Sequence, residues 1–300
     1  MRQPDGMLRS QSRAVQAWLI AVIVSATWGC GDSRRNPPAT APSTEVSGES
    51  SPGTPLRIAA ASDLQAALPE VATRFRAMTG IELSLTFGPS GQLAEQIKQG
   101  APFDLFLSAN ESFVRDLAVA GLINPDSVRS YARGSLVLAV YHTFGEQVRS
   151  LNDLTIPAVK KIALANPATA PYGKAGKQAL ERAGLWEKVE RKIVFAESVR
   201  QALLYAQRGD AEAAIVGRAI ANVPEIRSVK IDASLHDPII QALGVVAATT
   251  RVADTERFAR FVLDQHGQNI LKQFGFAPAG DDLGAESREQ SRPATKSGSP

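Results

Sequence analysis

The chain has 300 residues, with 33 Lys and Arg against 30 Asp and Glu, one Cys, and 44% hydrophobic side chains. This length supports one large or two modest domains, and this apolar content excludes a chain that is disordered throughout. A single Cys cannot form an internal disulfide, and three scattered His argue against a His-built metal centre. The formal charge of +3 is too small to indicate a nucleic-acid-binding surface.

Residues 1–30 have the pattern of an export signal. Arg2, Arg9 and Arg13 form a positive region, and an apolar run follows over residues 14–26. At about 12 residues this run is too short to cross a bilayer, which takes about 20. We therefore expect this signal to be removed on export, which lowers the formal charge from +3 to +1 because three Arg and one Asp are lost.

The only Cys, Cys30, follows Ala26-Thr27-Trp28-Gly29 at the end of this segment. The arrangement resembles a bacterial lipoprotein cleavage site, where the new N-terminal Cys receives lipid. We expect Cys30 to be lipidated and to anchor the exported protein to a membrane. The alternative is an incidental Cys in an ordinary signal peptide.

Two further segments have compositions that cannot build a core. Residues 31–55 are rich in Pro, Ser, Thr, Gly and Glu, which predicts a flexible tether. Residues 278–300 have a similar composition and predict a disordered tail.

Between residues 56 and 277, short apolar runs typical of strands alternate with amphipathic segments typical of helices. In chain order the strands are predicted at 56–61, 82–87, 104–108, 136–141, 161–165, 193–195, 213–216 and 239–248. The helices are predicted at 64–80, 92–99, 111–120, 174–183, 200–208, 255–267 and 269–274. Such alternation predicts parallel strands covered by helices, and two successive groups of similar size predict two lobes.

Small polar or glycine-containing turns occupy four strand-to-helix junctions, where open α/β sheets bind ligands. They contain Ser62, Ser90, the Pro171–Gly173 turn and the Ser198-Val199 pair. Each junction offers free backbone N–H groups and the positive end of a helix dipole, which together favour an anion. The alternative is that Ser62, Ser90 and Ser198 are helix N-caps and bind nothing.

Five segments in order carry a resemblance to a known family. They are Ala59–Ser62, Phe87–Leu93, Gly100–Ala109, the stretch from Ala165 to Leu180, and Glu197–Leu203. Together they closely resemble the periplasmic molybdate-binding proteins of ABC transporters, over about residues 55–277.

The resemblance implies an α/β fold of the type II periplasmic-binding-protein class. Two lobes, each a mixed sheet flanked by helices, would be joined by two crossing strands, with the ligand cleft between them. Lobe 1 would comprise residues 56–134 plus 239–277, and lobe 2 residues 135–238. Such proteins are usually monomers that work outside the cytoplasm, here in the periplasm, and deliver their ligand to an ABC permease with its ATPase.

The resemblance also implies a ligand and its donors. Molybdate or tungstate would be held by the hydroxyls and amides of Ser62 and Ser90 and by the backbone amides of Tyr172 and Val199. No cofactor and no direct metal ligand is implied, since molybdenum would enter only inside the oxyanion. Many relatives place a tyrosine donor where this chain has Gly217, so one donor is either missing or supplied by Tyr172, Arg200 or water.

Other classes of function fit the sequence less well. An enzyme could use Asp63 and Asp104 as an acid/base pair, but no nucleophile, phosphate-loop or metalloprotease motif is present in the sequence. We instead expect Asp63 to stabilise a first helical turn and Asp104 to be a structural group at a strand edge. A transcriptional regulator is disfavoured by the export signal. Another tetrahedral oxyanion, such as sulfate or thiosulfate, is the open alternative.

Overall fold

The structure, a computed structural model, describes residues 53–280. One five-stranded sheet has the order β2-β1-β3-β10-β4. Its strands are β1 (Leu56–Ala61), β2 (Leu83–Gly88), β3 (Leu105–Ser108), β4 (Arg129–Gly134) and β10 (Ile239–Val245). β1 is parallel to β2 and β3, whereas β10 is antiparallel to both β3 and β4. The carboxyl ends of β1, β2 and β3 therefore meet at one edge of this sheet.

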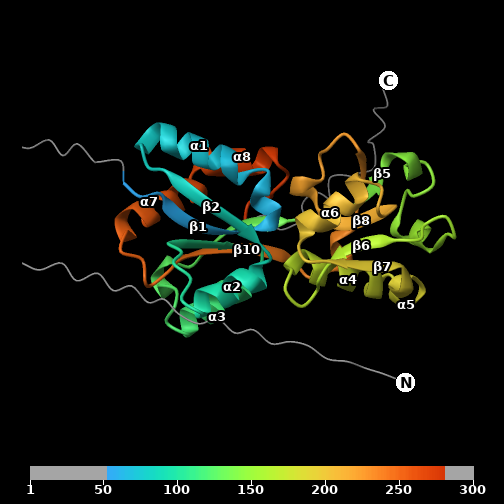
Figure 1. Cartoon of the computed structure of the whole chain (residues 1–300), viewed down its shortest axis with the longest axis horizontal. Helices are drawn as coiled ribbons and strands as arrows, with labels where there is room; N and C mark the ends of the chain where they lie inside the picture. The colour runs from blue at the N-terminus through green and yellow to red at the C-terminus, as the bar shows by residue number, and fades with distance from the viewer. Residues whose placement is uncertain (1–52, 281–300) are drawn as a thin grey trace, which may run out of the picture. The chain divides into compact units, whose positions relative to one another are not determined.

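Helices cover both faces of the first sheet (Figure 1). On one face lie α1 (Leu68–Thr79), α7 (Val252–Leu263) and α8 (Gln265–Gln273). On the other lie α2 (Ser90–Lys98) and α3 (Glu111–Val119). The first face is closed by aromatic packing, with the ring centroid of Phe75 4.9 Å from that of Phe258 and 5.4 Å from that of Phe261. We call this sheet with its helices the first lobe.

The second five-stranded sheet has the order β7-β6-β8-β5-β9. Its strands are β5 (Leu136–Tyr141), β6 (Ile162–Ala165), β7 (Ile193–Ala196), β8 (Ala213–Gly217) and β9 (Ile226–Lys230). β6 is parallel to β7 and β8, and β5 is antiparallel to β8 and β9. The helices α4 (Pro171–Arg182) and α6 (Val199–Gln207) pack on this sheet, and the short α5 (Trp186–Val189) follows α4. This sheet with its helices is the second lobe.

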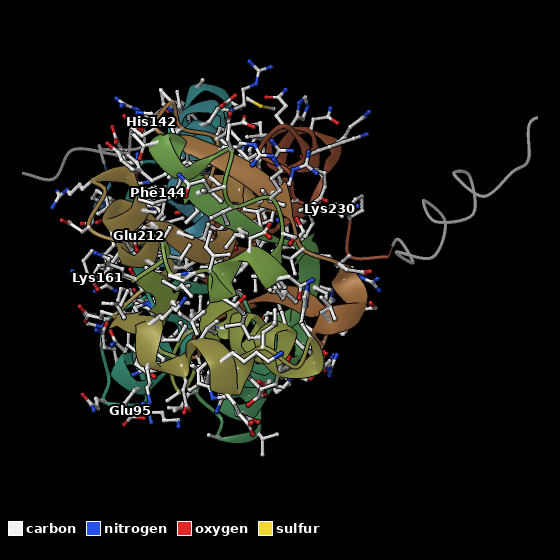
Figure 2. All side chains as sticks on the ribbon, turned by 90° about the vertical axis from the view of Figure 1, so that its right-hand side faces the viewer. Glu95, His142, Phe144, Lys161, Glu212 and Lys230 are labelled. Carbon is white, nitrogen blue, oxygen red and sulfur yellow. The ribbon has the colours of Figure 1, made fainter. Side chains whose placement is uncertain are left out.

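Three residues lie at the end of the second sheet where the parallel strands β6 and β8 begin, opposite the end where these strands finish. Lys161 and Glu212 precede these two strands, and the Lys161 N–H donates to a Glu212 carboxylate oxygen at 2.6 Å. His142, in a 3-10 turn directly after β5, lies at the same end because β5 is antiparallel to β8. Figure 2 shows these three residues on the side of the molecule that faces away from the first lobe.

The predicted strands and helices are present, with boundaries shifted by a few residues. The sheets differ in one respect from the parallel sheets that the alternation of strands and helices predicts. Both are mixed, as the resemblance implied, and not all-parallel. The predicted helix over residues 64–80 is in fact a 3-10 turn, η1 (Ser62–Gln65), followed by α1. Pro69 accounts for this break, since proline is accepted in the first turn of a helix but not in its interior.

Two strands, β4 and β9, were not predicted. β9 lies at an edge of its sheet, and most of its side chains are exposed or only partly buried. β4 carries Arg129 and Arg133 beside the buried Tyr131. Charged edge strands are common because they block pairing with other chains, and they leave little hydrophobic pattern in the sequence.

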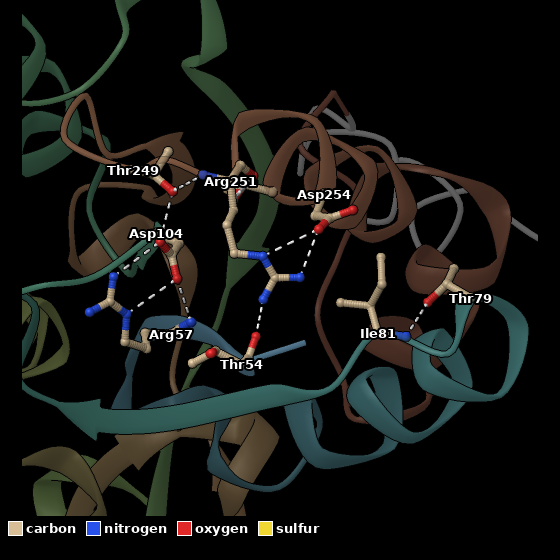
Figure 3. Close-up of polar contacts among 9 residues, drawn as sticks. Thr54, Arg57, Thr79, Ile81, Asp104, Thr249, Arg251 and Asp254 are labelled. Atoms are coloured by element: carbon tan, nitrogen blue, oxygen red, sulfur yellow. Dashed lines mark hydrogen bonds and ion pairs between the residues drawn. The ribbon is translucent and has the colours of Figure 1, made fainter. Parts of the chain in front are cut away.

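Asp104 fixes the start of β3 against β1, as Figure 3 shows. Its carboxylate accepts the Arg57 N–H at 2.7 Å, the Thr249 hydroxyl at 2.7 Å, and the Arg57 guanidinium at 3.4 Å. Burial opposes ionisation, but these hydrogen bonds outweigh it and hold the pKa of Asp104 below its usual value. The interpretation of Asp104 as a structural group is confirmed.

The predicted signal segment with Cys30, and most of the predicted tether and tail, lie outside the described residues. The first sheet takes its strands from residues 56–134 and 239–245, and the second from residues 136–230. The exact lobe boundaries stay a prediction. Within residues 53–280, no helix has the length and apolar character needed to cross a membrane.

Candidate oxyanion-binding site

A pocket lies between the two lobes, at the carboxyl ends of the parallel strands of both sheets. From the first lobe it is lined by residues 61–63, 88–90 and 109, and from the second by residues 170–172 and 199. Ser62, Ser90, Tyr172 and Val199, which were singled out from the sequence, all line it. They come from four separate segments of the chain, so the fold brings together what the sequence spreads over about 140 residues.

Two serines offer hydroxyl groups from the first lobe. The Ser90 hydroxyl oxygen accepts the Ala109 N–H at 3.0 Å, which fixes the side chain and leaves its hydrogen free to be donated. The Ser62 hydroxyl has no hydrogen-bond partner among the described residues, although the residue is only 6% exposed. Neither serine is an N-cap: those positions belong to Ala61 and Pro89, so the capping alternative is wrong for both.

Two helix N-termini offer backbone N–H groups from the second lobe. Tyr172 and Val199 stand in the first turns of α4 and α6, where N–H groups have no partner within the helix. No described residue accepts from either N–H. Ser198 is the N-cap of α6 and accepts the Gln201 N–H at 3.1 Å, so the capping interpretation is confirmed for this serine.

Gly173 allows α4 to start close to the sheet. A Cβ atom at this position would lie 2.1 Å from the backbone oxygen of Ala165, at the end of β6. Only glycine permits this approach, which sets the depth of the Tyr172 N–H in the pocket.

The ring of Tyr172 fills the space beside Gly217. A Cβ atom at Gly217 would lie 2.8 Å from the Tyr172 ring, and one at Gly134 would lie 2.0 Å from its hydroxyl oxygen. Tyr172 is 2% exposed, and its hydroxyl oxygen accepts a hydrogen bond from Gln241 Nε2 at 3.0 Å. The same hydroxyl donates a hydrogen bond to the Asp63 carboxylate. Its hydroxyl hydrogen is thus engaged within the protein, so this group does not replace the tyrosine donor that the resemblance implied at the position of Gly217.

A buried polar cluster adjoins the pocket and was not foreseen. Gln241 on β10 accepts the Tyr131 hydroxyl at 2.6 Å and donates to Asp63 Oδ2 and to the Tyr172 hydroxyl. All four residues are at most 2% exposed. Asp63 follows β1, whereas Asp104 precedes β3 beside the start of β1, so these carboxylates lie at opposite ends of the sheet and cannot form an acid/base pair.

Asp63 lines the pocket and is incompletely satisfied. Its Oδ1 has no hydrogen-bond partner among the described residues. Burial raises the pKa of Asp63 to about 6, and hydrogen bonds from Gln241, Tyr172 and the backbone N–H groups of Asp63 and Leu64 offset only part of that effect. Asp63 does stand in the first turn of η1, as expected, and it also lines the pocket, which was not foreseen.

Part of this cluster had a signal in the sequence. Gln241 is the one polar side chain in the otherwise apolar run Ile239–Val246, and a polar residue inside a buried strand calls for a hydrogen-bond partner. Which partner it meets depends on the pairing of β10 with β4, which periodicity does not encode.

No cationic side chain lines the pocket. Arg200 donates to Gln207 at 3.4 Å, and Lys174 lines a neighbouring hollow that includes Asn110 and Asp237. Nor does the described part of the chain contain three or more His, Cys, Asp or Glu grouped to hold a metal ion. The pocket offers mainly neutral N–H and O–H donors, which suit a fully deprotonated oxyanion.

Comparison with known proteins now identifies the family. The family described as "Bacterial extracellular solute-binding protein" matches residues 56–277. The chain belongs to this family. Its members bind solutes outside the cytoplasm, which confirms the expectation of an extracytoplasmic binding protein in place of an enzyme.

Individual relatives agree with this assignment. The chain is 31% identical, over 78% of its own length and 90% of the relative's, to a Bacillus subtilis protein that carries the provisional name ABC transporter substrate-binding lipoprotein YvgL. It is 29% identical to the molybdate-binding protein ModA of Rhodobacter capsulatus, over 69% and 82% of the two chains. Recognition of the molybdate-binding protein family from sequence motifs is thereby confirmed.

A solved structure matches the fold. The periplasmic molybdate-binding protein of Azotobacter vinelandii superposes with a TM-score of 0.70 at 30% identity, covering 74% of this chain and 98% of that one. The prediction of a two-lobed α/β periplasmic-binding fold is confirmed.

Proposed function

We propose that this protein captures molybdate or tungstate outside the cytoplasm and delivers it to an ABC permease with its ATPase. The observation that carries the proposal is the convergence of Ser62, Ser90, Tyr172 and Val199 on one pocket, with N–H and O–H hydrogens that no described residue accepts. The names of the relatives from Rhodobacter and Azotobacter support the same ligand.

The chemistry of the pocket supports a tetrahedral dianion. Molybdate carries four acceptor oxygens and no proton at neutral pH, so a ring of donors can satisfy every oxygen. Helix N-termini offset the charge without a cationic side chain. Sulfate has shorter bonds to oxygen than molybdate, so donors spaced for the larger anion reach it less well.

Titration calorimetry of the purified protein with molybdate, tungstate, sulfate and phosphate tests this proposal. We expect micromolar or tighter binding of molybdate and tungstate, with much weaker heats for sulfate and phosphate. Preferential binding of sulfate, or of thiosulfate titrated in the same way, would favour the alternative that the ligand is another tetrahedral oxyanion. The absence of heat with both molybdate and tungstate would refute the proposal.

The cellular setting is also part of the proposal. We infer a periplasmic monomer held at a membrane by lipid on Cys30, and the Bacillus relative with "lipoprotein" in its name supports the anchor. Mass spectrometry of the mature N-terminus tests it, and a peptide that starts at a residue other than Cys30 would contradict it.

A further inference from the structure

The pocket contains one group that conflicts with a simple dianion site. Asp63 lines it, and the Asp63 Oδ1 atom is buried without a hydrogen-bond partner, while Oδ2 is held by Gln241. Among the described residues only one other side-chain oxygen that is completely shielded from solvent lacks a partner, Thr169 Oγ1, and Thr169 does not line the pocket. An ionised carboxylate at this place would repel a dianion, and a buried oxygen without a partner is unfavourable in the empty site.

We propose that Asp63 binds the oxyanion as a neutral carboxylic acid and donates a hydrogen bond to it through Oδ1. One proton passes from solvent to Asp63 as the dianion enters, and the oxyanion itself stays unprotonated. Asp63 thereby supplies the donor that Gly217 lacks. This inference rests on the proposed function, since it assumes a dianionic ligand.

The geometry explains why the proton belongs on Asp63. Oδ2 already accepts a hydrogen bond from Gln241, which leaves the buried, unpartnered Oδ1 to carry the hydrogen. Gln241 is itself held by the Tyr131 hydroxyl at 2.6 Å, so the orientation of the Asp63 carboxyl group is fixed. The carboxyl group is preorganised for one remaining partner.

The surroundings of Asp63 offer no charge that would keep it ionised. The titratable groups that face it are Tyr131 on β4 and Tyr172 on α4, and burial, followed by the charge of Asp63, raises the pKa of both well above 10, so they are neutral. No cation is among the groups that shift the pKa of Asp63, and two nearby cations are engaged elsewhere, Arg57 with Asp104 and Arg200 with Gln207.

The protonation equilibrium sets a pH dependence. Burial raises the pKa of Asp63 to about 6 before any ligand is present, and a dianion nearby raises it further. If only the protonated form binds, the apparent affinity follows the protonated fraction, which falls about 50-fold between pH 6 and pH 8.

The test measures molybdate affinity of the purified protein at pH 6 and pH 8, and proton uptake by calorimetry at pH 7 in buffers of different ionisation enthalpy. We expect binding about 50-fold weaker at pH 8, with uptake of about 0.9 proton at pH 7. Asp63→Asn carries a permanent N–H donor and should bind equally at both pH values without proton uptake. Asp116→Asn, an exposed change on α3, is the matched control and should behave as the wild type.

Three results would overturn the inference. Tight molybdate binding with equal affinity at pH 6 and pH 8 and no proton uptake by the wild type would refute it while leaving the proposed function intact. Tighter binding of hydrogenphosphate than of molybdate at pH 8 would mean that Asp63 is ionised and accepts the ligand's proton. No molybdate binding at either pH would refute the proposed function and this inference with it. The wild-type measurements stand even if Asp63→Asn fails to fold.

Discussion

Ser62 and Ser90 supply the two pocket hydroxyls that are free to donate, since the third, on Tyr172, is engaged by the protein. We expect Ser62→Ala and Ser90→Ala each to weaken molybdate binding by about 1–3 kcal/mol, the usual cost of losing a hydrogen bond to a charged group. Titration calorimetry checks this, with the exposed Ser112→Ala as a control that leaves affinity unchanged. Unchanged affinity in both pocket variants would mean that these serines do not contact the ligand.

Asp63 also makes the stability of the ligand-free protein depend on pH. Its pKa is about 6 in the folded protein against an ordinary value of 3.8, so the folded state holds a proton that the unfolded chain releases. The stabilisation is present below pH 3.8 and is lost as the pH rises through 6.

We therefore expect Asp63→Asn to gain stability relative to the wild type between pH 4 and pH 7.5, by about 2–3 kcal/mol. Urea unfolding of both ligand-free proteins at the two pH values measures this difference. Acids with lowered pKa values, such as Asp104, titrate alike in both proteins and cancel. A difference between the proteins that stays constant with pH would contradict the buried ionisation.

At the scale of elements, a large side chain on α4 fills space that a side chain on β8 would otherwise occupy. Tyr172 on α4 occupies the space beside Gly217 on β8, so a side chain at 217 and a ring at 172 exclude each other. This pairing accounts for glycine at position 217, where the resemblance implied a tyrosine. It also leaves the pocket one donor short on the side of β8.

A double-mutant cycle tests this exchange. Gly217→Tyr should overpack the site and cost about 1–3 kcal/mol, and Tyr172→Ala should empty it and cost about 3–5 kcal/mol. The double variant should cost less than the sum, measured by urea unfolding, because each change relieves the other. Gly217→Tyr combined with Tyr141→Ala, at the far end of β5, should be additive. Additivity in the first pair would show that the two positions do not share this space.

The elements that could be predicted are those whose own residues encode them. β1 follows from an apolar run, and the end of α1 from Gly80, which adopts the left-handed conformation with φ of 73°. The break between η1 and α1, the charged strand β4 and the antiparallel place of β10 depend on partners far along the chain. Local sequence pattern cannot supply them.

At the scale of the whole molecule, the two lobes contact each other around the pocket. The Gly91 N–H on α2 donates to the Thr169 carbonyl of the second lobe at 2.9 Å. Ala61 and Ala109, from the first lobe, pack into the hydrophobic cluster of the second. The pocket is thus formed by both lobes together, and a ligand in it would link them.

The four predicted donors could be named from the sequence because they sit at strand-to-helix junctions, which share one edge of each sheet. The role of Asp63 could not, because it depends on Gln241, 178 residues away, and on a tyrosine ring from the other lobe. Whether a carboxyl group stabilises a helical turn or faces a pocket is decided only when the lobes meet.

The most direct test of the account is a crystal of the protein grown with sodium molybdate and measured at the molybdenum absorption edge. We expect one anomalous peak between the lobes, with the oxyanion within hydrogen-bond distance of the Ser62 and Ser90 hydroxyls, the Tyr172 and Val199 N–H groups, and Asp63 Oδ1. An empty pocket, or molybdenum bound only elsewhere on the surface, would contradict the central claim that this pocket binds the oxyanion.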